Sequence, residues 1–296
     1  MFNVTRAARL AGYALGGTAS VVAGQGVYVR LKFVLPPDAS GPTSGVACAA
    51  PAGPGPSSGL WPMQQQQPPP RRRNIIFLGD SLVTGVGCDH EVGEGPTLPR
   101  AVAHELSRKL GAEVSWLALG ETGADILSLS SRLMPSLKRE VERCGAAGER
   151  VDAVVIVCGL NDMKSCFLFC QPHLNPVAFA ANLRQVVAAV RELTGDGCAV
   201  LLPGVSVDGI PRFEPFWPLS AFIGGVAQMW ESRKEAVAHE MAAAGARVAF
   251  ATAKGVVFDA GHFCRDGMHP NDEGYTFWAT LMAEDLARVI DAGRGS

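Results

Sequence analysis

The chain lacks an excess of charge of either sign. Only 18% of its 296 residues are charged, and the formal net charge is −2 at pH 7. A protein that binds nucleic acid through phosphate contacts usually carries a basic excess, so we expect no nucleic-acid partner. Apolar residues make up 48% of the chain, which is enough to build the core of one large α/β domain or two small ones.

Acidic residues are missing from the first 37 positions, and the stretch 10–29 carries no charge at all. Two arginines precede this stretch, and an arginine and a lysine follow it. Its length suits a helix that crosses a bilayer, although its Gly and Ala content makes the transfer free energy marginal. For residues 1–34 we weigh a membrane anchor, a cleaved secretory signal, an organellar targeting peptide and a poorly ordered tail. We favour an anchored or organelle-targeted protein over a cytoplasmic one, with any membrane contact made through residues 10–29.

Residues 35–73 have few large apolar side chains and are dense in Pro, Gly, Ser and Gln, including the run QQQQPPPRRR. Such a composition cannot bury enough apolar surface to offset the entropy of ordering the chain. We therefore predict a disordered linker over residues 35–73 and a folded domain over residues 74–292. Residues 1–73 are then expected to set location and to be dispensable for chemistry.

The eight cysteines have no repeated spacing. Cys158 and Cys198 fall in or beside apolar runs, where a cysteine usually acts as a small buried hydrophobe. Cys166, Cys170 and His173 have a loose metal-like spacing, but a structural zinc site normally has four ligands and no fourth is evident. We expect no metal site and no disulfide framework, a pattern that suits a reducing compartment.

From residue 74 onward, segments typical of strands alternate with segments typical of helices. Apolar runs predict strands at residues 74–79, 112–119, 151–159, 198–205 and 246–251. Helical spacing predicts helices at residues 98–110, 125–141, 176–193, 227–245 and 271–290, with Pro135 as a break in the second. This alternation predicts an α/β protein with a parallel five-stranded sheet covered by helices on both faces, a three-layer α/β/α fold.

Four polar segments follow predicted strands or precede the last helix, where ligands bind in such folds. Ser81 follows the first strand, but a serine hydroxyl is a weak nucleophile unless a base activates it. The glycines of residues 120–125 let a backbone N–H approach a developing oxyanion, and residues 159–162 offer a side-chain amide as a further donor. Residues 266–275 pair a carboxylate with a histidine three positions later. Each segment alone is typical of a turn or a helix cap, but together they indicate a serine-based site.

The four segments GDSLVTGVG, GETGAD, GLND and DGMHP resemble the sequence blocks of the SGNH (GDSL-type) hydrolase family. The resemblance extends from residue 74 to residue 290. It implies a flavodoxin-like three-layer fold, serine esterase, lipase or thioesterase chemistry on a small-molecule or lipid acyl ester, and no cofactor. Ala118 departs from the family pattern, because many members place a supporting Asn there.

Carried over position by position, the resemblance implies that Ser81 is the nucleophile and that His269 is the general base, oriented by Asp266. It also implies an oxyanion hole made by the backbone N–H groups of Ser81 and Gly123 with the side chain of Asn161.

The segment PRFEPFWPLSAFIGG resembles a long loop that some bacterial-type esterases of the family carry. We expect four side chains to line an acyl pocket: Leu160, Phe216, Trp217 and Phe222. The alternative is that the aromatic side chains only pack the loop onto the body of the domain.

Other assignments fit the sequence less well. No Lys follows the glycine-rich segment at the spacing of a nucleotide-binding loop, and Val83 stands where an α/β-hydrolase nucleophile elbow has Gly. A non-catalytic binding module that keeps the SGNH fold is the alternative from another functional class. Asp259 and His262 repeat the D-x-x-H spacing of Asp266 and His269, and we prefer the second pair because a proline and a helix start follow it. The sequence does not indicate the oligomeric state.

Overall fold

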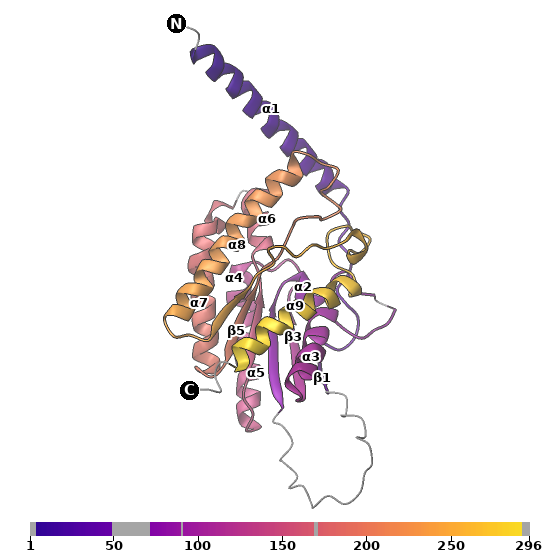
Figure 1. Ribbon diagram of the computed structural model, residues 1–296, viewed down its shortest axis with the longest axis vertical. Helices are drawn as coiled ribbons and strands as arrows, with labels where there is room; N and C mark the ends of the chain where they lie inside the picture. Colours follow the sequence, from indigo (N-terminus) through magenta and orange to yellow (C-terminus); the bar gives the residue numbers. More distant parts are fainter. Residues whose placement is uncertain (1–3, 49–71, 90, 169–170, 292–296) are drawn as a thin grey trace, which may run out of the picture.

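The computed structural model describes residues 4–48, 72–89, 91–168 and 171–291 (Figure 1). Within them, the chain forms a six-stranded sheet in the order β1-β3-β2-β4-β5-β6. Five of its strands are parallel and lie in the predicted segments: β2 (Arg73–Gly79), β3 (Val114–Gly120), β4 (Ala153–Val157), β5 (Ala199–Pro203) and β6 (Val248–Ala251).

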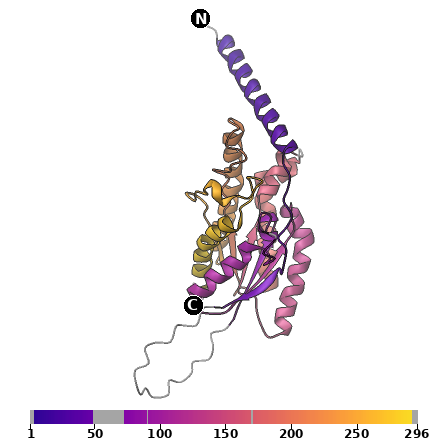
Figure 2. The same cartoon turned by 90° about the vertical axis from the view of Figure 1, so that its right-hand side faces the viewer.

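Helices cover both faces of the sheet, so the predicted three-layer α/β/α fold is confirmed (Figure 2). One face packs against α3 (Thr97–Leu110) and α9 (Asp272–Asp291). The other packs against α5 (Met134–Ala146), α7 (Pro176–Thr194) and α8 (Leu219–Ala243). Short helices lie at the carboxyl edge and in the connections: α2 (Ser81–Thr84), α4 (Ile126–Ser128), α6 (Leu160–Leu168) and two 3₁₀ turns, Pro172–Leu174 and Ala260–His262.

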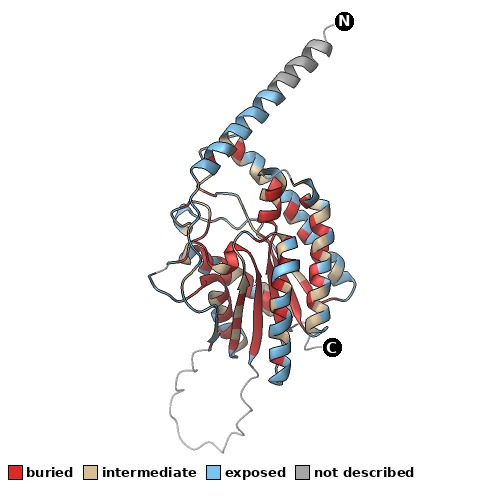
Figure 3. Cartoon of the chain, turned by 180° about the vertical axis from the view of Figure 1, so that it is seen from behind, coloured by how far each residue is buried: buried red, intermediate tan, exposed pale blue. Residues whose placement is uncertain are grey.

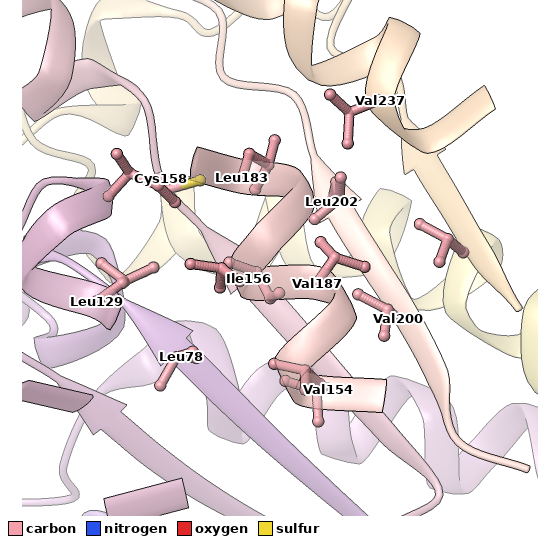
Figure 4. Packing of buried hydrophobic residues seen from close by; sticks show 14 of the residues in the cluster. Leu78, Leu129, Val154, Ile156, Cys158, Leu183, Val187, Val200, Leu202 and Val237 are labelled. Carbon is pink, nitrogen blue, oxygen red and sulfur yellow. The ribbon is translucent and has the colours of Figure 1, made fainter. Parts of the chain in front are cut away.

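Alternate side chains of the central strands enter the two halves of the core. Ile76 and Leu78 of β2 pack on the face covered by α5, α7 and α8, as Figure 4 shows for Leu78 and its neighbours. Ile75 and Phe77 pack on the opposite face, against α3 and α9. Since successive side chains of a strand point to opposite faces, a continuous apolar run is what a strand buried on both faces requires.

The helix expected at residues 125–141 is present, and it is irregular just before Pro135 instead of broken at that residue. A π-helical turn (Leu129–Leu133) separates α4 from α5, and Pro135 stands in the first turn of α5. Proline lacks an N–H and its ring crowds the preceding turn, which accounts for the irregular turn before Pro135. The helix α8 begins at Leu219, earlier than the expected start at residue 227.

The linker prediction for residues 35–73 is wrong for the described part of that segment. Residues 44–47 form the edge strand β1 (Ser44–Ala47), antiparallel to β3. Just before it, the backbone N–H of Ala39 donates to the carbonyl of Thr84 at 3.0 Å. Backbone pairing at a sheet edge depends little on side-chain composition, which is why the sequence pattern does not show it. Residues 49–71 lie outside the described residues, and the linker there stays a prediction.

The first helix, α1 (Val4–Leu31), runs outward from the body, and its end lies beside α8 (Figure 1). No helix in the described part of the chain combines the length and the hydropathy that a membrane span needs. The side chains described on this helix, from residue 16 onward, are mostly exposed, as Figure 3 shows.

Candidate active site

Ser81 stands at the carboxyl end of the central strand β2, as the first residue of α2. The strand ends in Gly79, where a Cβ atom would lie 2.5 Å from the carbonyl oxygen of Val157, so β2 and β4 can approach this closely only with glycine there. The Asp80 carboxylate then accepts a hydrogen bond from the backbone N–H of Leu82 at 3.1 Å and caps α2. The sharp change from strand to helix places the Ser81 side chain at the sheet edge.

The structure brings Ser81, His269 and Asp266 into one hydrogen-bonded chain. Ser81 Oγ lies 3.1 Å from His269 Nε2, and His269 Nδ1 lies 2.6 Å from Asp266 Oδ2. All three residues are buried. The other carboxylate oxygen of Asp266 accepts the backbone N–H groups of Met268 at 2.7 Å and His269 at 2.9 Å, which fixes the loop before α9.

These bonds also define the protonation of the pair. Burial by itself would raise the pKa of Asp266, but the hydrogen bonds from His269 and Met268 outweigh it and hold that pKa below its ordinary value. Asp266 is therefore ionised at neutral pH and can only accept, so the imidazole proton sits on Nδ1. Nε2 is left as an acceptor for the hydroxyl proton of Ser81.

Asn161 is held by two charged neighbours of opposite sign. Its Nδ2 donates to Asp80 Oδ2 at 3.0 Å, and its Oδ1 accepts from Lys164 Nζ at 2.5 Å. A carboxylate needs a donor and an ammonium needs an acceptor, so this pair of bonds leaves one orientation for the amide. An amide has two N–H groups, of which Asp80 accepts one, and Asn161 lines the adjoining cavity.

Gly123 lines the same cavity from the loop after β3. Its φ of 85° lies in the left-handed region, whereas a Cβ atom there would meet nothing within 4 Å. The backbone conformation, and not a lack of space, is thus what favours glycine. This loop is tied to the segment of Asn161 by Asp162, whose two carboxylate oxygens accept the N–H of Ile126 at 3.1 and 3.2 Å.

Asp162 should make the stability of the fold depend on pH. Burial, the largest cause, raises its pKa to about 7, whereas the carboxyl of an unfolded chain titrates near about 4. Between these values the native state holds a proton that the unfolded state has lost, so its contribution to stability is full below about pH 4 and is lost as the pH rises through about 7.

We therefore expect the variant Asp162→Asn, which keeps an oxygen for Ile126 but cannot ionise, to gain on the wild type as the pH rises. The measurement is the free energy of unfolding from urea denaturation of both proteins between about pH 4 and pH 8. A difference between the two proteins that stays constant across this range would contradict the assignment.

The second D-x-x-H pair has a different environment. His262 Nδ1 accepts the backbone N–H of Asp259 at 3.0 Å, and its ring stacks on Phe277 with centroids 5.2 Å apart. These contacts fix the 3₁₀ turn that precedes the Asp266 loop. The hydroxyl of Ser81 is instead contacted by His269.

A cavity of about 460 Å³ adjoins Ser81, His269, Gly123 and Asn161. Leu160 and Phe222 line it, whereas the prediction that Phe216 and Trp217 do so is wrong. Phe216 packs instead against Tyr28 with ring centroids 5.7 Å apart, and Trp217 is 77% exposed. The direction in which a loop turns its aromatic side chains depends on the elements beneath it, here α1, which the sequence pattern did not place.

One wall of this cavity comes from residues 25–39, which we call the N-terminal strap. Val29 is buried in that wall, and the ring of Phe33 lies 6.5 Å from the ring of His269. Arg212 holds the strap in place, since its guanidinium lies 5.8 Å from the Phe33 ring centre and donates to the Val29 carbonyl at 3.4 Å. The side chain of Gln25 bonds the backbone of residues 217 and 219.

Because of these contacts, we now expect part of residues 1–73 to be needed for stability and turnover. We expect a protein that starts at Arg73 to melt at a lower temperature and to lose at least about tenfold in kcat/KM on a soluble ester, because it lacks β1 and the apolar side chains of one cavity wall. A protein that starts at Gly16 keeps the strap and serves as the control. Unchanged melting and turnover in the shorter protein would restore the sequence-based expectation.

The structure also identifies site residues that the sequence analysis missed. Asp80 and Lys164 orient Asn161, and Asp162 joins two of the polar segments. The signal for Lys164 was its spacing of three residues from Asn161, which places the two on one face only if the segment is helical. In the described part of the chain no group of three or more His, Cys, Asp or Glu is arranged to hold a metal ion, and Cys170 lies outside it.

Comparison with known proteins finds one matching family model and several solved structures with a similar fold. The model of the GDSL-like lipase/acylhydrolase family matches residues 77–277. No curated protein matches the chain.

Among solved structures, a family 3 carbohydrate esterase from Clostridium thermocellum aligns with a TM-score of 0.53 and 15% identity over 74% of this chain and 98% of its own. A carbohydrate acetylesterase from Sinorhizobium meliloti aligns with a TM-score of 0.50 and 20% identity over 73% and 99%. A lipase from a goat rumen metagenome aligns with a TM-score of 0.50 and 19% identity over 73% and 97%.

These identities show the fold alone. The family match, however, spans well over half of the chain and includes all four polar segments. Ser81, Gly123, Asn161 and His269 all lie inside it. The chain therefore belongs to the GDSL-like lipase/acylhydrolase family, a family of ester hydrolases.

Proposed function

We propose that the protein hydrolyses carboxylic esters with apolar acyl groups through an acyl-enzyme on Ser81. The observation that carries this proposal is the hydrogen-bonded chain from Ser81 through His269 to Asp266, at the edge of a cavity lined mainly by apolar side chains. A serine within hydrogen-bond distance of an imidazole that a buried carboxylate orients is the arrangement that nucleophilic catalysis needs.

In the first half of the reaction, Ser81 Oγ attacks the ester carbonyl carbon while its proton passes to His269 Nε2. The imidazolium that forms is stabilised by the ionised Asp266. Negative charge develops on the carbonyl oxygen, which the N–H groups of Ser81 and Gly123 and the amide of Asn161 would bind. When the intermediate collapses, the carbon–oxygen bond to the alcohol breaks and His269 gives its proton to the leaving oxygen.

In the second half, His269 takes a proton from water, and the resulting hydroxide attacks the acyl carbon. Collapse of the second intermediate releases the carboxylic acid and returns the proton to Ser81. The same donors serve both halves because both intermediates place their charge on the same oxygen. The cycle uses water together with side chains and backbone N–H groups of the chain.

The cavity favours a substrate with several methylene groups over an acetyl ester. Leu160, Phe222 and Ile223 line it from α6 and α8, and Val29 and Phe33 line it from the N-terminal strap. Two of the structural neighbours are named carbohydrate esterases and one a lipase, and they support ester hydrolysis without indicating which ester this chain takes.

The test is turnover of p-nitrophenyl esters of rising acyl length. Each buried methylene contributes about 0.8 kcal/mol, so kcat/KM should rise by roughly tenfold or more from acetate to hexanoate. A preference for acetate would contradict the apolar acyl site while leaving the serine mechanism intact. Absence of turnover on every ester would instead favour a non-catalytic binding module with the same fold.

A further inference from the structure

The opening of the cavity is bordered by exposed apolar side chains. Leu35, Phe167 and Phe222 line the cavity and are also 46%, 47% and 43% exposed, so they mark where it meets the solvent. Phe167 and Phe222 contact each other edge to face, with ring centroids 5.6 Å apart. An ester that enters the site therefore passes these apolar side chains.

Further apolar side chains stand beside this opening without cover. Leu31 and Val34 of the N-terminal strap are 78% and 80% exposed, and Trp217 is 77% exposed. Trp217 is fixed next to the strap, because its carbonyl accepts a hydrogen bond from the Gln25 side chain at 2.9 Å. We call the six side chains named so far the apolar rim: Leu31, Val34, Leu35, Phe167, Trp217 and Phe222.

The charges near the apolar rim are distributed unevenly. Within the N-terminal strap, Arg30 and Lys32 flank Leu31, and the acidic residue of the strap, Asp38, accepts hydrogen bonds from Thr84 and Thr122. Arg30 also lines the cavity. The loop before α8, which contacts the strap through Arg212, holds Asp208 and Glu214. The charges next to Leu31 and Val34 are therefore positive, and they would attract an anionic surface.

We propose that the apolar rim docks the protein on an anionic lipid surface, with the opening of the cavity facing the lipid. Soluble monomeric proteins rarely leave large apolar side chains gathered at one place, and such patches mark interaction sites. A bilayer satisfies both features at once, since its acyl chains accept the rim and its head groups accept the cations. This proposal depends on the proposed function only where it takes the lipid to be the source of the ester substrate. Binding to the lipid can be measured without turnover.

The experiment is sedimentation of the full chain with phosphatidylcholine vesicles, with and without phosphatidylglycerol. We expect the protein to sediment with the anionic vesicles at low ionic strength and to be released by salt. The triple variant Leu31→Ser, Val34→Ser and Trp217→Ser should bind at least about tenfold more weakly, because it loses apolar surface that the lipid would cover. Its turnover of a soluble ester should stay within about twofold, since none of the three side chains lines the cavity.

The matched control is Val177→Ser, at a valine of α7 that is 64% exposed and outside the apolar rim. It should sediment like the wild type. Equal binding of the triple variant and the wild type, or no binding of the wild type to anionic vesicles, would overturn the proposal. A dimer in light scattering that the triple variant abolishes would also overturn it, because the apolar rim would then be covered by a second copy of the chain.

Discussion

Replacing Ser81 or His269 by alanine is expected to lower kcat on an ester by roughly four to six orders of magnitude, with the double variant no slower than either single one. The two side chains share one hydrogen bond of 3.1 Å, and each is useless to the proposed reaction without the other. Effects of residues that act as a unit do not add, so the kinetics of the three variants test the pairing and not only the importance of each residue.

His262→Ala provides the control for this prediction. His262 contacts Phe277 and the backbone of Asp259, so its loss should change stability while kcat stays within about threefold. Asp266→Ala should cost less than His269→Ala, because it removes the group that orients the base but leaves the base itself. With folding checked by circular dichroism, an inactive His262→Ala beside an active His269→Ala would show that the wrong histidine has been assigned.

Asn161→Ala is expected to lower kcat by about 10²–10³, the usual loss for one preorganised donor to an oxyanion, while KM changes little. The donor is preorganised because Asp80 and Lys164 hold the amide from both ends. Asn175→Ala is the matched control, since it removes an amide that caps α7 at 2.9 and 3.1 Å and should affect stability alone. A kcat of Asn161→Ala within about threefold of the wild type would make Asn161 a structural residue.

The parallel core of the fold follows from the sequence because each strand buries both faces. Continuous apolar runs such as that of β4 have few other uses in an α/β protein, and helical spacing between them supplies the layers. The edge strand β1 could not be found in this way. Its pairing with β3 is made by backbone groups in a segment rich in Gly, Ser and Pro, so no apolar period marks it.

Some parts of the candidate site could likewise be predicted from the sequence, and others could not. The positions of Ser81, Asn161 and His269 could be expected at one sheet edge, because each follows a strand or precedes the last helix. The cavity wall made by the N-terminal strap could not, since it depends on contacts between residues almost two hundred positions apart, such as Arg212 with Val29. Side chains whose role depends on such contacts are visible only in the folded chain.

The most direct test of the proposed mechanism is the site of reaction with a fluorophosphonate, which adds covalently to an activated serine. We expect one adduct per chain, located by mass spectrometry in the tryptic peptide of residues 74–100, where Ser81 is the only serine. The variant Ser81→Ala should take up no label, and His269→Ala should react far more slowly. An adduct elsewhere, with Ser81 unmodified in protein that still hydrolyses esters, would contradict the account.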